Sequence, residues 1–245
     1  MSSHGQSQYQ VRFDWGLEGA RTIAVDADVI VVIDVLSFTT AVDVATSRGA
    51  EVVVSGGPDA QALAERLGAV LAGPRGEGPS LSPASLTELA PDSRLVLPSP
   101  NGSALSAALI EHPAIVVAGS LRNRRAIADW ALAQQGDKGD RFTIAVVAAG
   151  EVRDDGTTRF AVEDLLGAGA VIDALADVGI DYCSPESAAA SAAFTGLRNA
   201  TGHLIGASAS GRELAERGYR ADVDIAIDVD VSSAVPVLGE FGYRA

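Results

Sequence analysis

The chain has 245 residues, of which 47% are hydrophobic and 20% are charged. This length and balance fit one large α/β domain or two small ones, and they exclude a generally disordered chain. Eighteen basic residues against 32 acidic ones give a net charge of −14, which disfavours nucleic acid and anionic membrane surfaces as partners. No uncharged apolar run approaches ~18 residues, so no membrane span is expected.

Several reactive residue types are scarce. Cys183 is the one cysteine, which excludes an intrachain disulfide and a cysteine-based zinc cluster. The histidines His4, His112 and His203 are too scattered for a metal motif, and the single lysine, Lys138, lies in a polar loop. The first ten residues are polar and lack the apolar core of a signal peptide, so the cytoplasm is the expected compartment.

The first half of the chain alternates strand and helix signals. Residues 1–9 are expected to be a disordered tail, followed by one α/β domain over residues 10–245. Runs of β-branched residues predict strands, and apolar residues at helical spacing predict helices. In chain order, strands are expected at 10–15, 28–34, 51–55 and 95–97, and helices at 37–46, 58–67 and 104–111. Residues 73–85, rich in Gly, Pro and Ser, predict a long loop, which is more often functional than a short connection.

The second half continues the alternation. Strands are expected at 114–118 and 142–148, a charged loop at 150–159, and helices at 121–134, 162–175, 187–194 and 207–217. Residues 221–231 alternate between apolar residues and aspartates, which predicts a strand. The solvent face of this strand would carry Asp222, Asp224, Asp228 and Asp230. Cation binding by these aspartates is the alternative to a solvated strand. Repeated strand–helix alternation predicts the α/β class with a largely parallel or mixed sheet covered by helices.

Three expected strand ends carry residues suited to binding an anion. Ligands of parallel sheets bind at the carboxyl ends of the strands, and free backbone N–H groups at helix starts attract oxyanions. Ordinary helix capping is the alternative for each loop taken alone. The candidate residues are Asp34 after the first of these strands, Asn101, Gly102 and Ser103 after the second, and Gly119 and Ser120 after the third.

Carboxylates and one arginine complete the candidate site. Glu163 and Asp164 stand in the first turn of an expected helix, where a favourable interaction with the helix dipole is the simplest explanation. Together with Asp34 they would also form an oxygen-only site suited to Mg²⁺. Arg75, near Glu77 in the long loop, is a candidate for bidentate contact with phosphate or sulfonate, or else a solvated loop arginine.

Five segments resemble, in order, motifs of the 2-phosphosulfolactate phosphatase family. They are Asp-Val-Leu-Ser-Phe-Thr-Thr from residue 34, Pro-Asn-Gly-Ser from 100, Ser-Leu-Arg-Asn from 120, Phe-Ala-Val-Glu-Asp with Gly-Ala-Gly-Ala over 160–170, and residues 224–237. The resemblance implies a three-layer α/β/α fold and Mg²⁺-dependent hydrolysis of 2-phospho-3-sulfolactate to 3-sulfolactate and phosphate, on a route to coenzyme M. The family commonly has an arginine where this chain has Ser37, and Arg75 is the candidate to replace that charge. Restoring an arginine at position 37 is expected to improve turnover of the sulfonated substrate.

The resemblance and the residues together predict a phosphomonoester hydrolase. The expected catalytic and metal-binding residues are Asp34, Glu163 and Asp164. The expected substrate-binding residues are Arg75, Asn101, Gly102, Ser103, Gly119, Ser120 and Asn123. Two alternatives stay open: a non-catalytic binder of small anionic metabolites, and a phosphatase of this family with another substrate. The expected partners are a small phosphorylated anion and a second copy in a homodimer.

Overall fold

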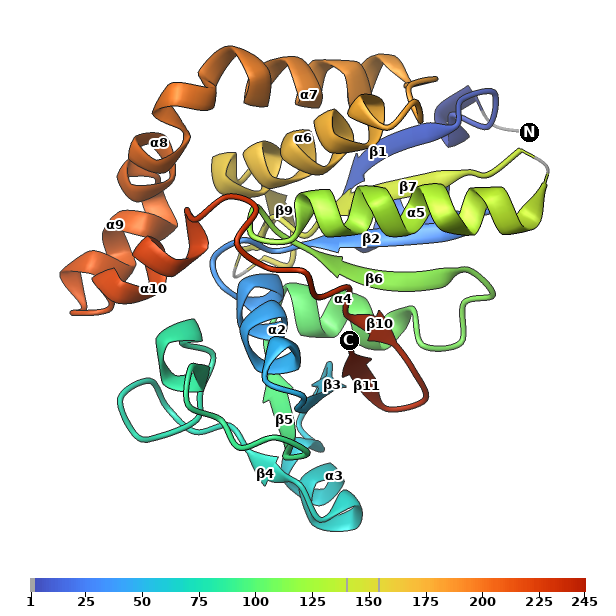
Figure 1. The fold of residues 1–245 in the computed structure, drawn as a ribbon. Coiled ribbons are helices and arrows are strands. Elements are labelled where there is room, and N and C mark those ends of the chain that lie inside the picture. Colours follow the sequence, from blue (N-terminus) through green and yellow to red (C-terminus); the bar gives the residue numbers. More distant parts are fainter. Residues whose placement is uncertain (1–2, 140, 154) are drawn as a thin grey trace.

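A central sheet of nine strands organises the computed structural model, which describes residues 3–139, 141–153 and 155–245 (Figure 1). The strand order is β1-β7-β2-β6-β10-β11-β3-β5-β4. The strands are β1 (Val11–Trp15), β2 (Val29–Ile33), β3 (Glu51–Ser55), β4 (Val70–Leu71), β5 (Arg94–Pro98), β6 (Ile115–Gly119), β7 (Ile144–Ala148), β10 (Val237–Leu238) and β11 (Gly242–Arg244).

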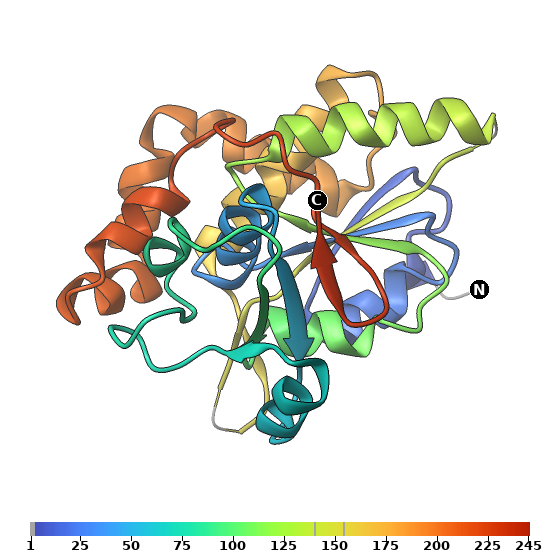
Figure 2. The ribbon, with the colours of Figure 1, turned by 60° about the horizontal axis from the view of Figure 1, so that its bottom comes forward.

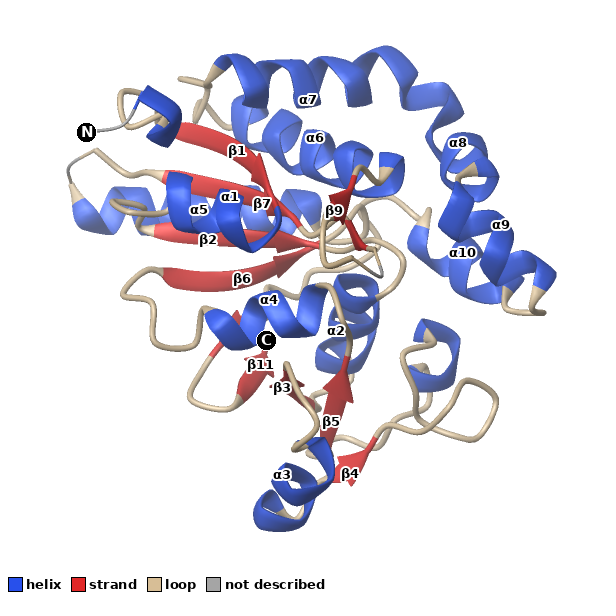
Figure 3. Ribbon diagram, turned by 180° about the vertical axis from the view of Figure 1, so that it is seen from behind, coloured by secondary structure: helices blue, strands red, loops and turns tan. Residues whose placement is uncertain are grey.

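Helices cover both faces of this sheet, as the reverse view in Figure 3 also shows. The helices of the chain are α1 (Gly16–Ile23), α2 (Phe38–Ser47), α3 (Ala60–Leu67), α4 (Gly102–Ala108), α5 (Arg124–Lys138), α6 (Val162–Asp177), α7 (Pro185–Leu197), α8 (Thr201–Ala207), α9 (Ala209–Glu216) and α10 (Arg220–Ala226). Strand β2 explains the arrangement, because all five of its residues are buried. Ile30 and Val32 pack with α1 and α4, whereas Val29, Val31 and Ile33 pack with α5 and α6. A strand buried on both faces belongs between two helical layers, so the expected α/β/α fold is confirmed.

A hairpin joins two parallel halves of the sheet. Strands β1, β7, β2 and β6 run parallel to one another, and so do β3, β5 and β4. Between them lie β10 and β11, which are antiparallel to each other and to their outer neighbours β6 and β3. Tyr243 of β11 is fully buried, and its hydroxyl lies 2.8 Å from the hydroxyl of Ser106. The sheet is therefore mixed, with its antiparallel part in the middle.

Helices α8–α10 form a helical arm over residues 201–226. The arm lies beside the edge at which the parallel strands end, next to the amino end of α2 (Figures 1 and 2). Strand β2 ends at this edge, and the chain turns there into α2. Within the described ranges, no helix combines the length and the apolar character needed to span a membrane.

The strand predicted over residues 221–231 is wrong. The chain forms α10 over Arg220–Ala226 and then runs without regular structure to β10. The alternation misled because α10 buries Val223 and Ala226 at helical spacing, and each of the four aspartates pairs with an arginine. The pairs are Asp222–Arg75, Asp224–Arg220, Asp228–Arg122 and Asp230–Arg124.

Two further expectations need correction. The charged loop at 150–159 contains a short hairpin, in which β8 (Glu151–Val152) pairs with β9 (Thr158–Arg159). Residues 3–9 do not form the disordered tail that was expected over residues 1–9. Gln6 is buried, and its side chain forms hydrogen bonds with both the backbone N–H and the carbonyl of Phe13. Residues 1–2 of that expectation lie outside the described part of the chain.

Candidate functional site

Asp34 lies at the centre of the candidate site, directly after β2, and is 4% exposed. Its Oδ1 accepts a hydrogen bond from the Phe38 backbone N–H at 3.2 Å, and its Oδ2 accepts one from the Gly102 N–H at 2.7 Å. The approach of α4 requires a glycine, because a Cβ at residue 102 would lie 2.6 Å from Asp34 Oδ2. The carboxylate is thus held in place by the starts of α2 and α4.

Asp164 and Glu163 reach the same place from the first turn of α6. Asp164 Oδ1 accepts the N–H of Val35 at 2.8 Å and Oδ2 accepts the N–H of Gly150 at 2.9 Å, so it holds the segments that follow β2 and β7. Glu163 is 3% exposed, and its carboxylate accepts no hydrogen bond from the described residues. Its negative charge acts on both Asp34 and Asp164. The structure therefore gathers the three carboxylates that the sequence singled out.

Burial changes the acidity of this cluster. Desolvation raises the pKa of Asp34 to about 6, against the opposing effect of its two backbone N–H donors, and the charges of Glu151 and Glu163 add to the rise. Desolvation and the charges of Asp34 and Glu163 also hold the pKa of Asp164 well above its usual range. Clustered carboxylates without a basic partner are unfavourable in a buried site, and a hard cation would relieve that repulsion.

The donor chemistry of the cluster fits Mg²⁺, because Asp34, Glu163 and Asp164 offer only carboxylate oxygens. Each oxygen of Asp34 and Asp164 that accepts one backbone N–H keeps a second lone pair. Across the described parts of the chain, no set of three or more His, Cys, Asp and Glu side chains has the arrangement of a preformed metal site. The fit therefore rests on charge and ligand type.

Metal-free protein is expected to lose stability as the pH rises from about 4 to about 7 because of Asp34. A carboxyl whose pKa is raised from 3.8 to about 6 on folding stabilises the fold below its unfolded pKa, and that contribution disappears as the pH passes its folded pKa. At about 1.36 kcal/mol per unit, the loss is roughly 3 kcal/mol. Urea unfolding in EDTA at pH 4, 5.5 and 7 measures it, and Asp34→Asn should flatten the difference. If the free energy of unfolding changes with pH in the same way in the wild type and in Asp34→Asn, Asp34 is not the group responsible.

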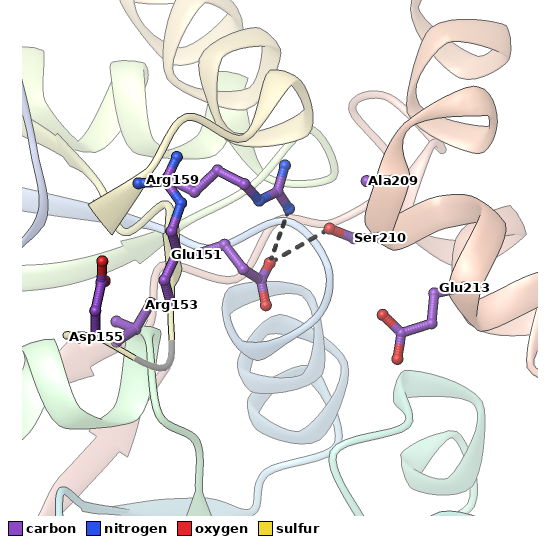
Figure 4. Close-up of a pocket in the computed structure, with 8 residues that line it drawn as sticks. Glu151, Arg153, Asp155, Arg159, Ala209, Ser210 and Glu213 are labelled. Atoms are coloured by element: carbon purple, nitrogen blue, oxygen red, sulfur yellow. Dashed lines mark hydrogen bonds and ion pairs between the residues drawn. The ribbon is translucent and has the colours of Figure 1, made fainter. Parts of the chain in front are cut away.

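Glu151 is a site residue that the sequence analysis missed. It begins β8, and its charge reaches Asp34. Its carboxylate lies 3.5 Å from Asn101 Nδ2, 3.3 Å from Ser210 Oγ and 3.7 Å from Arg159 Nη2. Beside it a cavity of about 560 Å³ opens between the β8–β9 hairpin and α9 (Figure 4). Glu151 was missed because residues 150–159 have the composition of a solvated loop.

Arg75 and Asn101 also lie at this edge. Arg75 Nη2 donates to Ser37 Oγ at 2.9 Å, and Nη1 pairs with Asp222. The long loop thus brings the candidate replacement charge next to Ser37. Asn101 is half-buried, and its Oδ1 accepts the N–H of Val152 at 3.1 Å. Arg75, Asn101 and Glu151 therefore lie at the same edge of the sheet as Asp34.

Four expected substrate-binding residues have other partners. Ser103 Oγ accepts the Ser55 N–H at 2.9 Å, which fixes α4 to the end of β3. Asn123 Oδ1 accepts both the N–H and the hydroxyl of Ser120, and Asn123 Nδ2 donates to two carbonyls. A Cβ at Gly119 would lie 2.7 Å from the side chain of Val31. The polar atoms of Ser120 and Asn123 close a turn, that of Ser103 joins two elements, and Gly119 permits close packing.

Comparison with models of known protein families gives a match that covers most of the chain. A family model described as 2-phosphosulpholactate phosphatase matches residues 20–240. The matched range includes all three carboxylates, Arg75 and Glu151. A search of curated proteins finds no match to the chain.

Proposed function

Because this chain belongs to the 2-phosphosulfolactate phosphatase family and is thus a phosphoric monoester hydrolase, we propose that it cleaves 2-phospho-3-sulfolactate to 3-sulfolactate and phosphate. The observation that supports this most strongly is the cluster of Asp34, Glu163 and Asp164 at the carboxyl edge of the sheet, with Arg75 beside it. Phosphoryl transfer requires positioning and charge stabilisation more than covalent chemistry from the protein. Carboxylates for a cation and an arginine for an anion provide these two functions.

In this proposal Asp34, Glu163 and Asp164 hold Mg²⁺, which when bound would polarise the phosphoryl group. The protein keeps the carboxylates of Asp34 and Asp164 in place through backbone N–H groups from the segments after β2, β5 and β7. Because these donors are backbone groups, the positions of the Asp34 and Asp164 carboxylates do not depend on the conformation of another side chain. Burial around the cluster excludes water, which strengthens its charge interactions.

Arg75 supplies positive charge for the substrate. The chain carries a net charge of −14, so a multiply charged anion needs a local cation to approach the carboxylates. The guanidinium has five N–H donors, and its bonds to Asp222 and Ser37 occupy only part of them. Arg75 can therefore bind phosphoryl or sulfonate oxygens without giving up these two partners.

Phosphate release tests the proposal. Purified protein with Mg²⁺ should release phosphate from 2-phospho-3-sulfolactate, with a higher kcat/KM than from 2-phospholactate, which lacks the sulfonate. A preference for 2-phospholactate would keep the reaction and overturn the substrate. If neither compound is hydrolysed while inorganic phosphate binds in calorimetry, the protein is a non-catalytic anion binder and the proposed function is wrong.

Ser37→Arg is expected to lower kcat/KM for 2-phospho-3-sulfolactate by roughly tenfold, corresponding to ~1.4 kcal/mol. The sequence analysis expected this substitution to improve turnover, but the structure indicates the opposite. Ser37 is 2% exposed and already accepts a hydrogen bond from Arg75. A second guanidinium there would repel the first. Steady-state kinetics measure the effect, with Ser37→Ala as the control that adds no charge. The double variant Ser37→Arg, Arg75→Ser should recover activity, and a gain from Ser37→Arg alone would refute this reasoning.

A further inference from the structure

Asp222 carries an ion pair that connects distant parts of the chain. It lies on α10 and pairs with Arg75 of the long loop, 147 positions away. The Asp222 side chain is 1% exposed and that of Arg75 is 14% exposed. Because this carboxylate is buried, removing its partner or its charge should have a larger effect than changing a surface pair.

The same carboxylate also fixes the far end of the long loop. Asp222 Oδ1 accepts hydrogen bonds from the Ser82 hydroxyl and from the Ala84 backbone N–H, the latter at 3.2 Å, while Oδ2 pairs with Arg75. Tyr219, on the same arm, donates its hydroxyl to the Arg75 carbonyl at 3.0 Å, and its ring centroid lies 5.6 Å from the guanidinium carbon. The helical arm thus holds both the backbone and the side chain of Arg75.

The other end of the guanidinium faces the carboxylate cluster. Its Nη2 donates to Ser37 Oγ, three residues after Asp34. Burial lowers the pKa of the Arg75 guanidinium, and the negative charges of Asp222 and Asp34 oppose that shift. Arg75 is therefore within electrostatic reach of Asp34 while one side of it is fixed by Asp222. Its Nε makes no hydrogen bond to the residues that the structure describes.

We infer that Asp222 is a positioning residue that orients the Arg75 guanidinium toward the anionic group of the substrate. This inference rests on the proposed function for the identity of the anion. A long arginine side chain in a loop would lose conformational entropy on binding a ligand, and fixing it beforehand lowers that cost. Asp222 does so from the helical arm, so it governs anion recognition without touching the anion.

Titration with inorganic phosphate, alongside kinetics with 2-phospho-3-sulfolactate, tests this role. Asp222→Asn should weaken phosphate binding and raise KM, each by about tenfold, with a smaller effect on kcat. In an Arg75→Met background the same change should have little further effect, because the residue that Asp222 orients is gone. Asp224→Asn is the matched control, because Asp224 lies on the same helix in an exposed pair with Arg220.

Ser82→Ala separates an effect on the orientation of Arg75 from an effect on folding. It removes the hydrogen bond from Ser82 to Asp222 but leaves the ion pair between Asp222 and Arg75. It should lower the melting temperature without raising the phosphate Kd. Unchanged phosphate binding in Asp222→Asn, additive effects with Arg75→Met, or no phosphate binding by the wild type would each overturn the inference. If the wild type binds phosphate but hydrolyses no phosphomonoester, the proposed function fails and the titrations still decide the role of Asp222.

Discussion

Asp34→Asn is expected to reduce kcat for 2-phospho-3-sulfolactate by at least ~100-fold, the loss typical of a removed group that stabilises transition-state charge. Asparagine keeps the shape of the side chain but supplies no negative charge for a cation. It can also accept only one of the two backbone N–H bonds that come from Phe38 and Gly102. Initial rates at saturating Mg²⁺ and substrate measure the effect.

A carboxylate at the other end of the same strand provides the control. Asp28 precedes β2 and pairs with Lys138 at 2.7 Å, far along the strand from the cluster. Asp28→Asn should leave kcat within about twofold, since surface pairs contribute little. An Asp34→Asn protein that unfolds yet retains its specific activity would assign Asp34 to structure alone.

Chelation is expected to reduce activity to background, and Mg²⁺ is expected to restore it. The reason is the repulsion among Asp34, Glu163 and Asp164. Among the described side chains, no arginine or lysine forms a direct ion pair with these carboxylates, and Arg75 acts on Asp34 only from a distance. A bound ion also stabilises the fold, by about 2.7 kcal/mol at 100 times its Kd. Thermal unfolding with and without Mg²⁺ therefore provides a readout that does not depend on turnover.

The Asp34→Asn protein is the control for that readout. Mg²⁺ should raise the melting temperature of the wild type and should have a much smaller effect on the variant. Ca²⁺ at the same concentration tests selectivity, because its larger radius prefers more ligands than this cluster offers. Full phosphatase activity after exhaustive chelation would contradict the Mg²⁺ proposal while leaving the family assignment intact.

The strands that were predicted correctly are continuous apolar runs with a strong local signal. Strand β2 is a continuous β-branched run, and β3 was placed at its observed bounds because its apolar run is flanked by Gly49 and Gly56. The helix α1, which packs against β1 and β7, was missed because Gly16 and Gly19 weaken its helix propensity. Local patterns thus identified the core strands but not the elements that depend on tertiary contacts.

The site was predictable only in part, for a similar reason. Asp34 follows a recognisable strand, and Glu163 and Asp164 lie in the first turn of a recognisable helix, so the sequence identified all three as candidates. Glu151 and Asp222 have no such context, because their importance comes from chain segments that are distant in sequence. Ser120 and Asn123 look like an anion-binding turn, yet each is the other's hydrogen-bond partner. Composition does not show whether a donor is already in use.

The hairpin in the middle of the sheet has a consequence for biosynthesis. Strands β6 and β3 can be joined only through residues 237–244, so both strands have an unpaired edge until the ribosome has released that segment. Nascent chains that stop before it would carry two separate parallel sheets with open edges, which favour association with other chains. Chaperone dependence should therefore be greatest for chains arrested just before residue 237 and should fall once Tyr243 can enter its buried position beside Ser106.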